Sequence, residues 1–263
     1  MSGYEISELK DLEDLRTLER TLAEIWGRPD EPPLDSDVLM ALVHSGNYVA
    51  GVRIGGRLYG GLVGWLGGMP PDRLILHSHI LGVTADIPMR GLGFALKQHQ
   101  RAWCLARGVK TMEWTFDPLV RRNAYFNLNK LGAEADEYLV NFYGAMSDGI
   151  NAGEESDRIL VTWRLDSARA QNAAAGRPTD VGPGDDLDAL LTVAPSGEPV
   201  QRSSTADRVT AEVPEDIVAM RRTDADLARA WRMALRSAFT QAFAAGYHIT
   251  GVTRTGRYLL AHR

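Results

Sequence analysis

The sequence has few of the features that mark secreted or membrane proteins. It contains a single cysteine, Cys104, so no disulfide framework can form within the chain. The opening residues, MSGYEISELKDLEDL, include neither a basic segment nor an apolar one, so we expect no signal peptide. No apolar run approaches the length that spans a membrane. These absences predict a cytoplasmic protein with no membrane partner.

An excess of positive charge is also missing. The chain has 29 Lys and Arg against 34 Asp and Glu, which gives a formal net charge of -5. A general nucleic-acid-binding domain is clearly basic, so we expect no nucleic-acid partner. A local basic patch for a small polyphosphate ligand remains allowed. With 263 residues, 44% of them hydrophobic, the chain is long enough to bury a substantial core.

Hydrophobic periodicity predicts strands and helices in alternation over residues 1–166, in an α/β fold with a mixed sheet. Residues 73–83 predict a long, mostly apolar strand, and a helix follows from Leu92 to Gly108. The segment after Asp166 is rich in Ala, Gly, Pro and Asp, and it predicts a linker or long loop over residues 167–186. Residues 187–263 predict a small α+β region, β-rich with one helix over 224–246.

The stretch between this strand and helix, Arg90-Gly-Leu-Gly-Phe-Ala95, carries the clearest chemical signal. The N-terminus of a helix offers unpaired N–H groups and the positive end of the helix dipole, and glycines let an anion approach the backbone. The spacing is neither the dinucleotide fingerprint nor a nucleotide P-loop. By spacing alone, a phosphate site and a plain turn into a core helix both remain open.

The wider run, LGVTADIPMRGLGFALK, resembles the signature of the GNAT acyltransferase superfamily, (Arg/Gln)-x-x-Gly-x-(Gly/Ala). Arg90, Gly93 and Ala95 occupy its three specified positions. The resemblance extends over the preceding strand, the following helix and strand, and the short helix that ends at Gly132, and the order of elements over residues 4–166 also agrees with that fold. The tail after Asp166 is not covered.

The resemblance implies that acetyl-CoA or another acyl-CoA is the co-substrate. Its pantetheine arm is expected to pair with the backbone of Leu81, Gly82 and Val83, and the Asn123 side chain is expected to contact that arm. Its pyrophosphate is expected on the N–H groups of six consecutive residues: Arg90, Gly91, Leu92, Gly93, Phe94 and Ala95.

Acyl transfer to an amine needs a base, and the resemblance implies one six residues before Val83, which is His77. His79 lies two residues further, on the same strand face if no bulge intervenes. An imidazole can accept an ammonium proton near neutral pH, but both histidines are also compatible with packing inside a sheet. Glu113 is the reserve base, or else an exposed strand residue. His-x-His lacks an evident third ligand, so no metal is expected.

The general acid is less well indicated. The resemblance implies a tyrosine four residues before Gly132, where this chain has Leu128. Tyr125 and Asn127 are near that position, and Tyr125 is equally compatible with simple packing. Asp117 follows a strand, at the edge where sites in such sheets open, and could hold the ammonium group of an acceptor. The alternative role of Asp117 is structural, in a turn formed with Pro118.

The predicted helix of the tail carries Arg229, Arg232 and Arg236 on one face. A solvated face is favoured over a lid that meets an acidic ligand.

Together these patterns predict an N-acyltransferase that moves an acetyl, succinyl or other short acyl group to a small amine, for example an amino acid. The alternatives are a protein N-acetyltransferase and a non-catalytic acyl-CoA sensor. A homodimer remains open.

Overall fold

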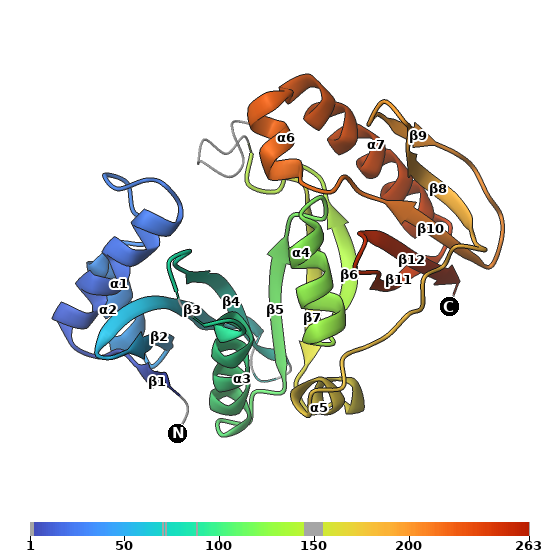
Figure 1. The fold of residues 1–263 in the computed structure, drawn as a ribbon. Coiled ribbons are helices and arrows are strands. Elements are labelled where there is room, and N and C mark those ends of the chain that lie inside the picture. Colours follow the sequence, from blue (N-terminus) through green and yellow to red (C-terminus); the bar gives the residue numbers. More distant parts are fainter. Residues whose placement is uncertain (1–2, 70, 72, 88, 145–154, 263) are drawn as a thin grey trace. The chain divides into compact units, whose positions relative to one another are not determined.

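In the computed structural model, the chain divides into two compact units, Met1–Trp114 and Thr115–Arg263. The structure describes residues 3–69, 71, 73–87, 89–144 and 155–262. The elements of each unit can be followed along the chain by colour (Figure 1).

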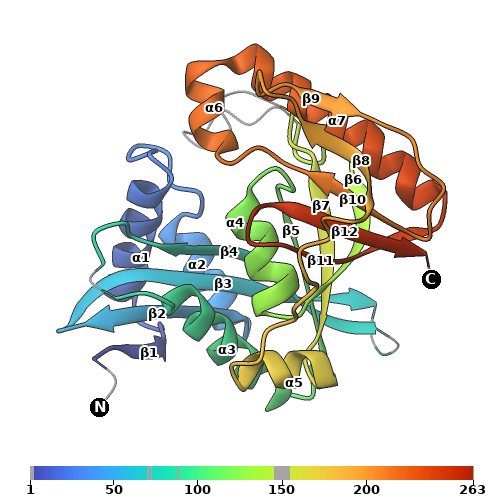
Figure 2. The same ribbon diagram turned by 45° about the vertical axis from the view of Figure 1, so that its right-hand side comes forward.

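The first unit contains a twisted mixed sheet with the strand order β1-β2-β3-β4-β5, whose neighbours β2, β3 and β4 run side by side in Figure 2. The first four strands pair antiparallel, and β4 pairs with β5 in parallel. Its elements are β1 (Glu5–Glu8), α1 (Leu12–Ile25), α2 (Ser36–His44), β2 (Tyr48–Ile54), β3 (Arg57–Met69), β4 (Arg73–Val83), α3 (Leu92–Leu105) and β5 (Thr111–Phe116), the last of which ends in the second unit. The predicted mixed sheet is thereby confirmed.

Helices cover both faces of this sheet. Side chains alternate along a strand, so Val49 and Tyr48 of β2 point to opposite faces. Val49 belongs to a core with leucines of α1 and α2, whereas Tyr48 contacts His99 and Trp103 of α3. The leucines that face inward on α1 include Leu15, which is fully buried. Burial of these apolar surfaces, at about 25 cal/mol per Å², supplies the main driving force for the unit.

Two irregularities of β4 shape its central part. A register shift between Val63 and Gly64 of β3 leaves His79 as an extra residue in β4. On its other side, β4 pairs with β5 only through Leu76 and His77. Among the described residues of the first unit, the edge of β4 beyond these positions therefore has no strand partner.

The second unit begins with the end of β5 and a short helix that continues as a π-helical turn. The antiparallel pair β6–β7 and helix α5 follow, and the unit ends in a five-stranded sheet with the order β11-β12-β10-β8-β9. The bounds are α4 (Arg121–Ala124), the π-helical turn η1 (Tyr125–Lys130), β6 (Glu134–Leu139), β7 (Arg158–Arg164), α5 (Ala168–Ala174), β8 (Asp188–Val193), β9 (Pro199–Gln201), β10 (Arg208–Glu212), α6 (Ile217–Thr223), α7 (Ala225–Ala244), β11 (Tyr247–Val252) and β12 (Arg257–His262).

Helix α7 packs against β6, β8, β9 and β11, and its apolar side is the core of the unit. Trp231, Leu235 and Phe239 are fully buried, as expected for the docking side of the helix. The Phe239 ring lies edge-on to Tyr258 of β12 at 5.1 Å and to Tyr138 of β6 at 6.0 Å. One continuous core therefore joins the tail to the β6–β7 pair.

Two expectations about the tail need correction. Part of the predicted linker, 167–186, is helix α5, whose N-terminus is capped by the hydroxyl of Ser167 accepting from the Ala170 N–H at 3.2 Å. The arginine face of α7 is not simply solvated, because Arg232 is buried and Arg236 is partly buried in ion pairs. The first compact unit ends at Trp114, and the division after residue 166 stays a prediction.

Candidate functional site

The turn into α3 has the geometry of an anion site. Gly91 is the N-cap of the 14-residue helix and has a left-handed backbone with φ of 87°. Among the described residues, no side chain caps this helix end, and its first turn contains no acidic residue. The first N–H groups of the helix thus stand at a positive dipole end without a competing carboxylate. Arg90 is exposed beside them.

The two glycines of the turn serve different purposes. Gly91 is required by its backbone angle, which residues with a Cβ rarely adopt. Gly93 is not in this region, and a Cβ placed on it would meet only Leu81 Cδ2, at an ordinary 3.7 Å. Internal packing therefore gives no reason for a glycine at position 93. A glycine at position 93 leaves space outside the turn for a ligand, and a pyrophosphate group suits that space.

The β4 edge next to this turn is suited to an extended ligand. Leu81, Gly82 and Val83 pair with β3 on one side, while pairing to β5 stops at His77. Gly82 is buried against Trp26, which would collide with a Cβ there at 2.6 Å. The predicted pantetheine-binding backbone therefore lies on an open strand edge within the first unit.

His77 and His79 share one side of β4 in spite of the bulge. Trp65 of β3 lies between them, with ring centroids 5.0 Å from His77 and 4.6 Å from His79. The two imidazoles are themselves 5.7 Å apart. The pKa of each ring lies below the ordinary histidine value, because of partial burial, with the Lys97 charge adding for His77 and the neighbouring His77 for His79. Both rings are consequently neutral at pH 7 and able to accept a proton.

Trp65 is a site residue that the sequence did not suggest. Its position follows from the β3–β4 register, which places Trp65 opposite His77. A hairpin prediction that extended the pairing beyond the first turn could have found it. Glu113, the reserve base, lies next to His77 in the parallel pair and forms an ion pair with Arg73. Its carboxylate is thus already matched by a cation.

Lys97 of α3 was also missed. Its side chain is buried on the opposite face of β4, where its ammonium donates to Ser78 Oγ at 2.7 Å and lies 3.6 Å from the Trp114 ring centroid. Ser78 in turn donates to Gln100 at 2.8 Å. Burial lowers the pKa of Lys97 to about 7, although Cys104 raises it slightly. The signal in the sequence was the helical spacing of Lys97 and Gln100, which share a face with the buried Cys104.

The predicted residues of the short helix lie in the second unit. Asn123 is exposed, Tyr125 is half-buried with the Arg254 guanidinium 5.6 Å from its ring, and Asn127 is buried. The π-helical turn from Tyr125 to Lys130 widens the helix by one residue per turn and changes which side chains share a face. Leu128, at the expected tyrosine position, is buried.

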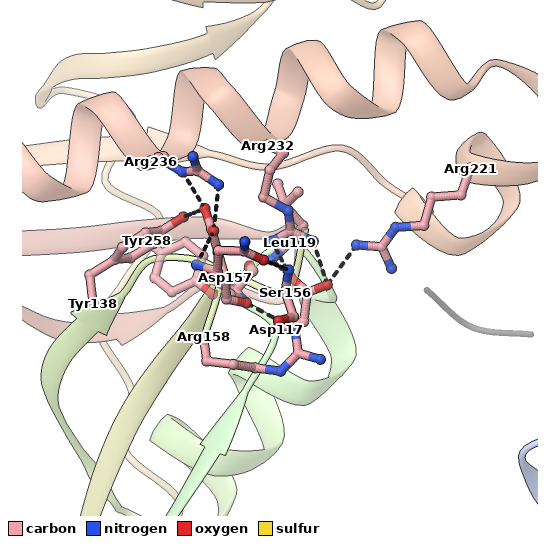
Figure 3. A network of polar contacts seen from close by, with 12 residues as sticks. Asp117, Leu119, Tyr138, Ser156, Asp157, Arg158, Arg221, Arg232, Arg236 and Tyr258 are labelled. Atoms are coloured by element: carbon pink, nitrogen blue, oxygen red, sulfur yellow. Dashed lines mark hydrogen bonds and ion pairs between the residues drawn. The ribbon is translucent and has the colours of Figure 1, made fainter. Parts of the chain in front are cut away.

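Asp117 is the centre of a buried ion cluster rather than an open carboxylate (Figure 3). Arg232 donates to both of its oxygens at 2.8 and 2.7 Å, and Arg221 donates to Oδ2 at 2.6 Å. Its Oδ1 also accepts from the Leu119 N–H at 2.9 Å, which closes the expected turn. Burial raises the pKa of Asp117, but the two arginines outweigh it and hold the pKa below the ordinary range.

Asp157 forms the second half of the cluster. Arg236 donates to it through two nitrogens, at 2.9 and 2.6 Å, and Tyr138 donates at 2.7 Å. The arginines of α6 and α7 thus meet the carboxylates next to β5 and β7, as Figure 3 shows. Within the described part of the chain, no group of three or more His, Cys, Asp or Glu could hold a metal, and no helix is long and apolar enough to cross a membrane.

No protein-family model and no curated protein matches the sequence. Solved structures match the fold of the chain. An acetyltransferase of the GNAT family from Streptococcus pneumoniae aligns with a TM-score of 0.50 at 15% identity, covering 60% of this chain and 97% of that one. The ribosomal-protein-S18-alanine N-acetyltransferase from Escherichia coli has a TM-score of 0.49 at 17% identity, covering 63% and 96%.

Naa50 from Arabidopsis thaliana, in complex with the bisubstrate analogue CoA-Ac-MVNAL, has a TM-score of 0.48 at 17% identity, covering 61% of this chain and 97% of that one. At such identities the likeness concerns the fold alone. The chain therefore has the fold of the GNAT acetyltransferases, an α/β fold with a mixed sheet, together with a β-rich C-terminal extension.

Proposed function

We propose that the protein transfers a short acyl group from an acyl-CoA to the amine of a small molecule. The observation that carries this proposal is the pairing of an uncapped helix N-terminus at Gly91 with the unpartnered β4 edge at Leu81, Gly82 and Val83. The first feature suits a pyrophosphate and the second suits an extended amide-containing arm. The GNAT fold agrees with this arrangement.

The chemistry assigned to His77 follows from its neutral state. The imidazole accepts a proton from the acceptor ammonium, and the freed amine attacks the thioester carbonyl carbon. The attacking nitrogen then loses its second proton to water, the C–S bond breaks, and the CoA sulfur leaves as a thiolate that takes up a proton. Because Leu128 stands where a tyrosine acid was expected, this proton comes from water or from another group. The roles of Asn123, Tyr125 and Asn127 stay predictions.

Acetyl-CoA and succinyl-CoA are the donors to test first, against a panel of small amines and amino acids. Titration calorimetry measures binding, and release of the CoA thiol measures transfer. Turnover with a small amine supports the proposal, whereas turnover only with a peptide favours the protein N-acetyltransferase. Binding without any turnover favours the acyl-CoA sensor. The absence of binding to any CoA ester would contradict all three.

Gly93→Glu should abolish CoA binding, because the new carboxylate lies at the helix end that we assign to the pyrophosphate. The matched control is Gly93→Ala. Its Cβ meets only Leu81 Cδ2 at 3.7 Å, so the fold should tolerate it. Both variants should keep the thermal midpoint within a few degrees of the parent protein. If Gly93→Glu binds CoA with unchanged affinity, the pyrophosphate is bound elsewhere.

His77→Gln should lower kcat by about 10² to 10⁴-fold with little change in the affinity for acyl-CoA. Because the pKa of His77 lies below 6.5, the acid limb of kcat/KM should also fall below pH 6.5 and disappear in the variant. His79→Gln is the control on the same side of the strand. An unaltered rate and pH profile in His77→Gln would move the base to Glu113 or to water.

A further inference from the structure

A pocket of about 920 Å³ opens in the second unit, far along the chain from the α3 turn. Three segments line it: α4 with its π-helical turn, the residues at the start of α6, and Arg254 in the turn between β11 and β12. Its volume is within the range of small-molecule sites in proteins. Nothing in the proposed acyl-CoA site uses these residues' cationic side chains.

The charge of this pocket is unbalanced. Its cations are Arg121, Arg122, Lys130 and Arg254, and its acids are Glu215 and Asp216. Both acids are engaged, since Glu215 pairs with Arg121 at 3.5 Å and Asp216 accepts from the Ala219 N–H at 3.0 Å. Among the described residues, Arg122, Lys130 and Arg254 have no carboxylate partner. Three exposed cations thus face one hollow.

The walls of the pocket are held in place by other contacts. Arg121 donates to the Thr255 carbonyl oxygen at 2.9 Å, and its stem lies directly beneath Gly256. Gly256 has a φ of 86°, and a Cβ there would meet Arg121 Cδ at 2.2 Å. The hairpin turn and the helix are therefore fitted to each other. Tyr125, whose ring faces Arg254, and Phe126 supply the aromatic part of the lining.

We infer that this pocket binds a small organic anion, an oxyanion group attached to an apolar or aromatic body. Guanidinium and ammonium groups bind carboxylate and phosphate alike, and the aromatic wall covers the body of the ligand. An anion there relieves the repulsion among three cations, which a cationic or neutral molecule cannot do. The inference does not require acyl transfer, although Tyr125 in the pocket wall is also a predicted general acid of that reaction.

Three probes with the same phenyl body test this inference on the full-length protein: phenylacetate, phenyl phosphate and phenethylamine. We expect at least one of the two anions to bind, with phenethylamine binding at least tenfold more weakly. Comparing phenylacetate with phenyl phosphate identifies the preferred head group. Comparing phenyl phosphate with inorganic phosphate measures how much the aromatic wall contributes to the affinity. Titration calorimetry or ligand-observed NMR provides the dissociation constants.

Arg122→Gln and Arg254→Gln should each weaken anion binding about tenfold, as expected for one charge-assisted hydrogen bond. Arg229→Gln, an exposed arginine of α7 outside the pocket, should have no effect. Both target residues are exposed, so the variants should fold normally. Equal binding of phenethylamine, or unchanged affinity in both variants, would overturn the inference. Equal weakening of CoA binding would assign the pocket to the co-substrate and likewise overturn a separate anion site.

Discussion

Asp117→Asn should destabilise the protein by about 3 to 5 kcal/mol at pH 7. The substitution keeps the shape of the side chain but removes the charge that balances two guanidiniums, those of Arg221 and Arg232. Both arginine side chains are almost completely buried, at 1% and 3% exposure, so water cannot replace the lost carboxylate. Breaking one partner of a buried ion pair is costly because the remaining charge stays in a medium of low polarity.

Urea unfolding at pH 7 measures this loss, and Asp185→Asn is the matched control. Asp185 also pairs with an arginine, Arg257, but its side chain is 74% exposed, so its removal should cost less than about 1 kcal/mol. The experiment also decides between two roles of Asp117. A variant with unchanged stability and a raised KM for the amine acceptor would restore the ammonium-binding role and contradict the structural one.

The pH dependence of this contribution has a definite sign. The native pKa of Asp117 is depressed below its unfolded value, so the unfolded chain binds the proton more readily. The stabilisation is therefore complete above the unfolded pKa of about 3.9 and is lost as the pH falls through the native value. The difference in stability between the parent protein and Asp117→Asn should accordingly be constant over the neutral range and shrink only in acid.

Lys97→Met should have the opposite effect and stabilise the protein by about 2 to 4 kcal/mol at pH 7. Lys97 is 3% exposed, and its ammonium has no carboxylate partner among the described residues. Methionine has a similar length, keeps the contact with Trp114, and removes the cost of burying a charge. Ser78 retains its hydrogen bond to Gln100.

The pH dependence identifies the cause. The native pKa of about 7 is below the unfolded value of 10.5, so the unfolded chain binds more protons between these values. The free energy of unfolding of the parent protein should therefore rise between pH 7 and pH 10.5, by about 1.4 kcal/mol per pH unit as the contribution of Lys97. The Lys97→Met variant should lack this slope. The groups around the ammonium are Ser78, Gln100, Met112, Trp114, His77 and Cys104.

Neither titratable neighbour disturbs this window. His77 titrates below it, and burial raises the pKa of Cys104 to about 12, above it. The control is Lys10→Met, an exposed lysine whose replacement should leave the pH slope unchanged. A Lys97→Met variant that is less stable than the parent at pH 7 would show that the ammonium is compensated in the native state.

The sequence was a good guide where one short segment decides the outcome. The N-cap Gly91 and the helix that begins at Leu92 form a turn with exposed N–H groups, so the α3 turn could be located from residues 90–95. The side-by-side position of His77 and His79 was predicted only for an unbulged strand. It holds because the bulge is at His79, with both rings against Trp65.

The sequence predicted the structure poorly where segments that are distant along the chain meet. Helical spacing correctly placed Arg232 and Arg236 on one face, but it could not show that Asp117 and Asp157, more than 70 residues away, face them. The preference for a solvated face followed from average behaviour, and the buried carboxylates reverse it. In the same way, the π-helical turn and the pocket at Arg254 depend on contacts that no local pattern contains.

The difference between what the sequence predicts and what the tertiary structure decides has a physical cause. Local sequence by itself determined the strand-turn-helix of the α3 turn, the alternation of helices and strands, and the missing tyrosine at Leu128, because backbone geometry and side-chain period act over a few residues. Only the tertiary structure decided which charges are buried together, that Lys97 has no carboxylate partner among the described residues, and that four cations of the second unit line one pocket. Charge pairing depends on distances through space, and those arise only when the chain has folded.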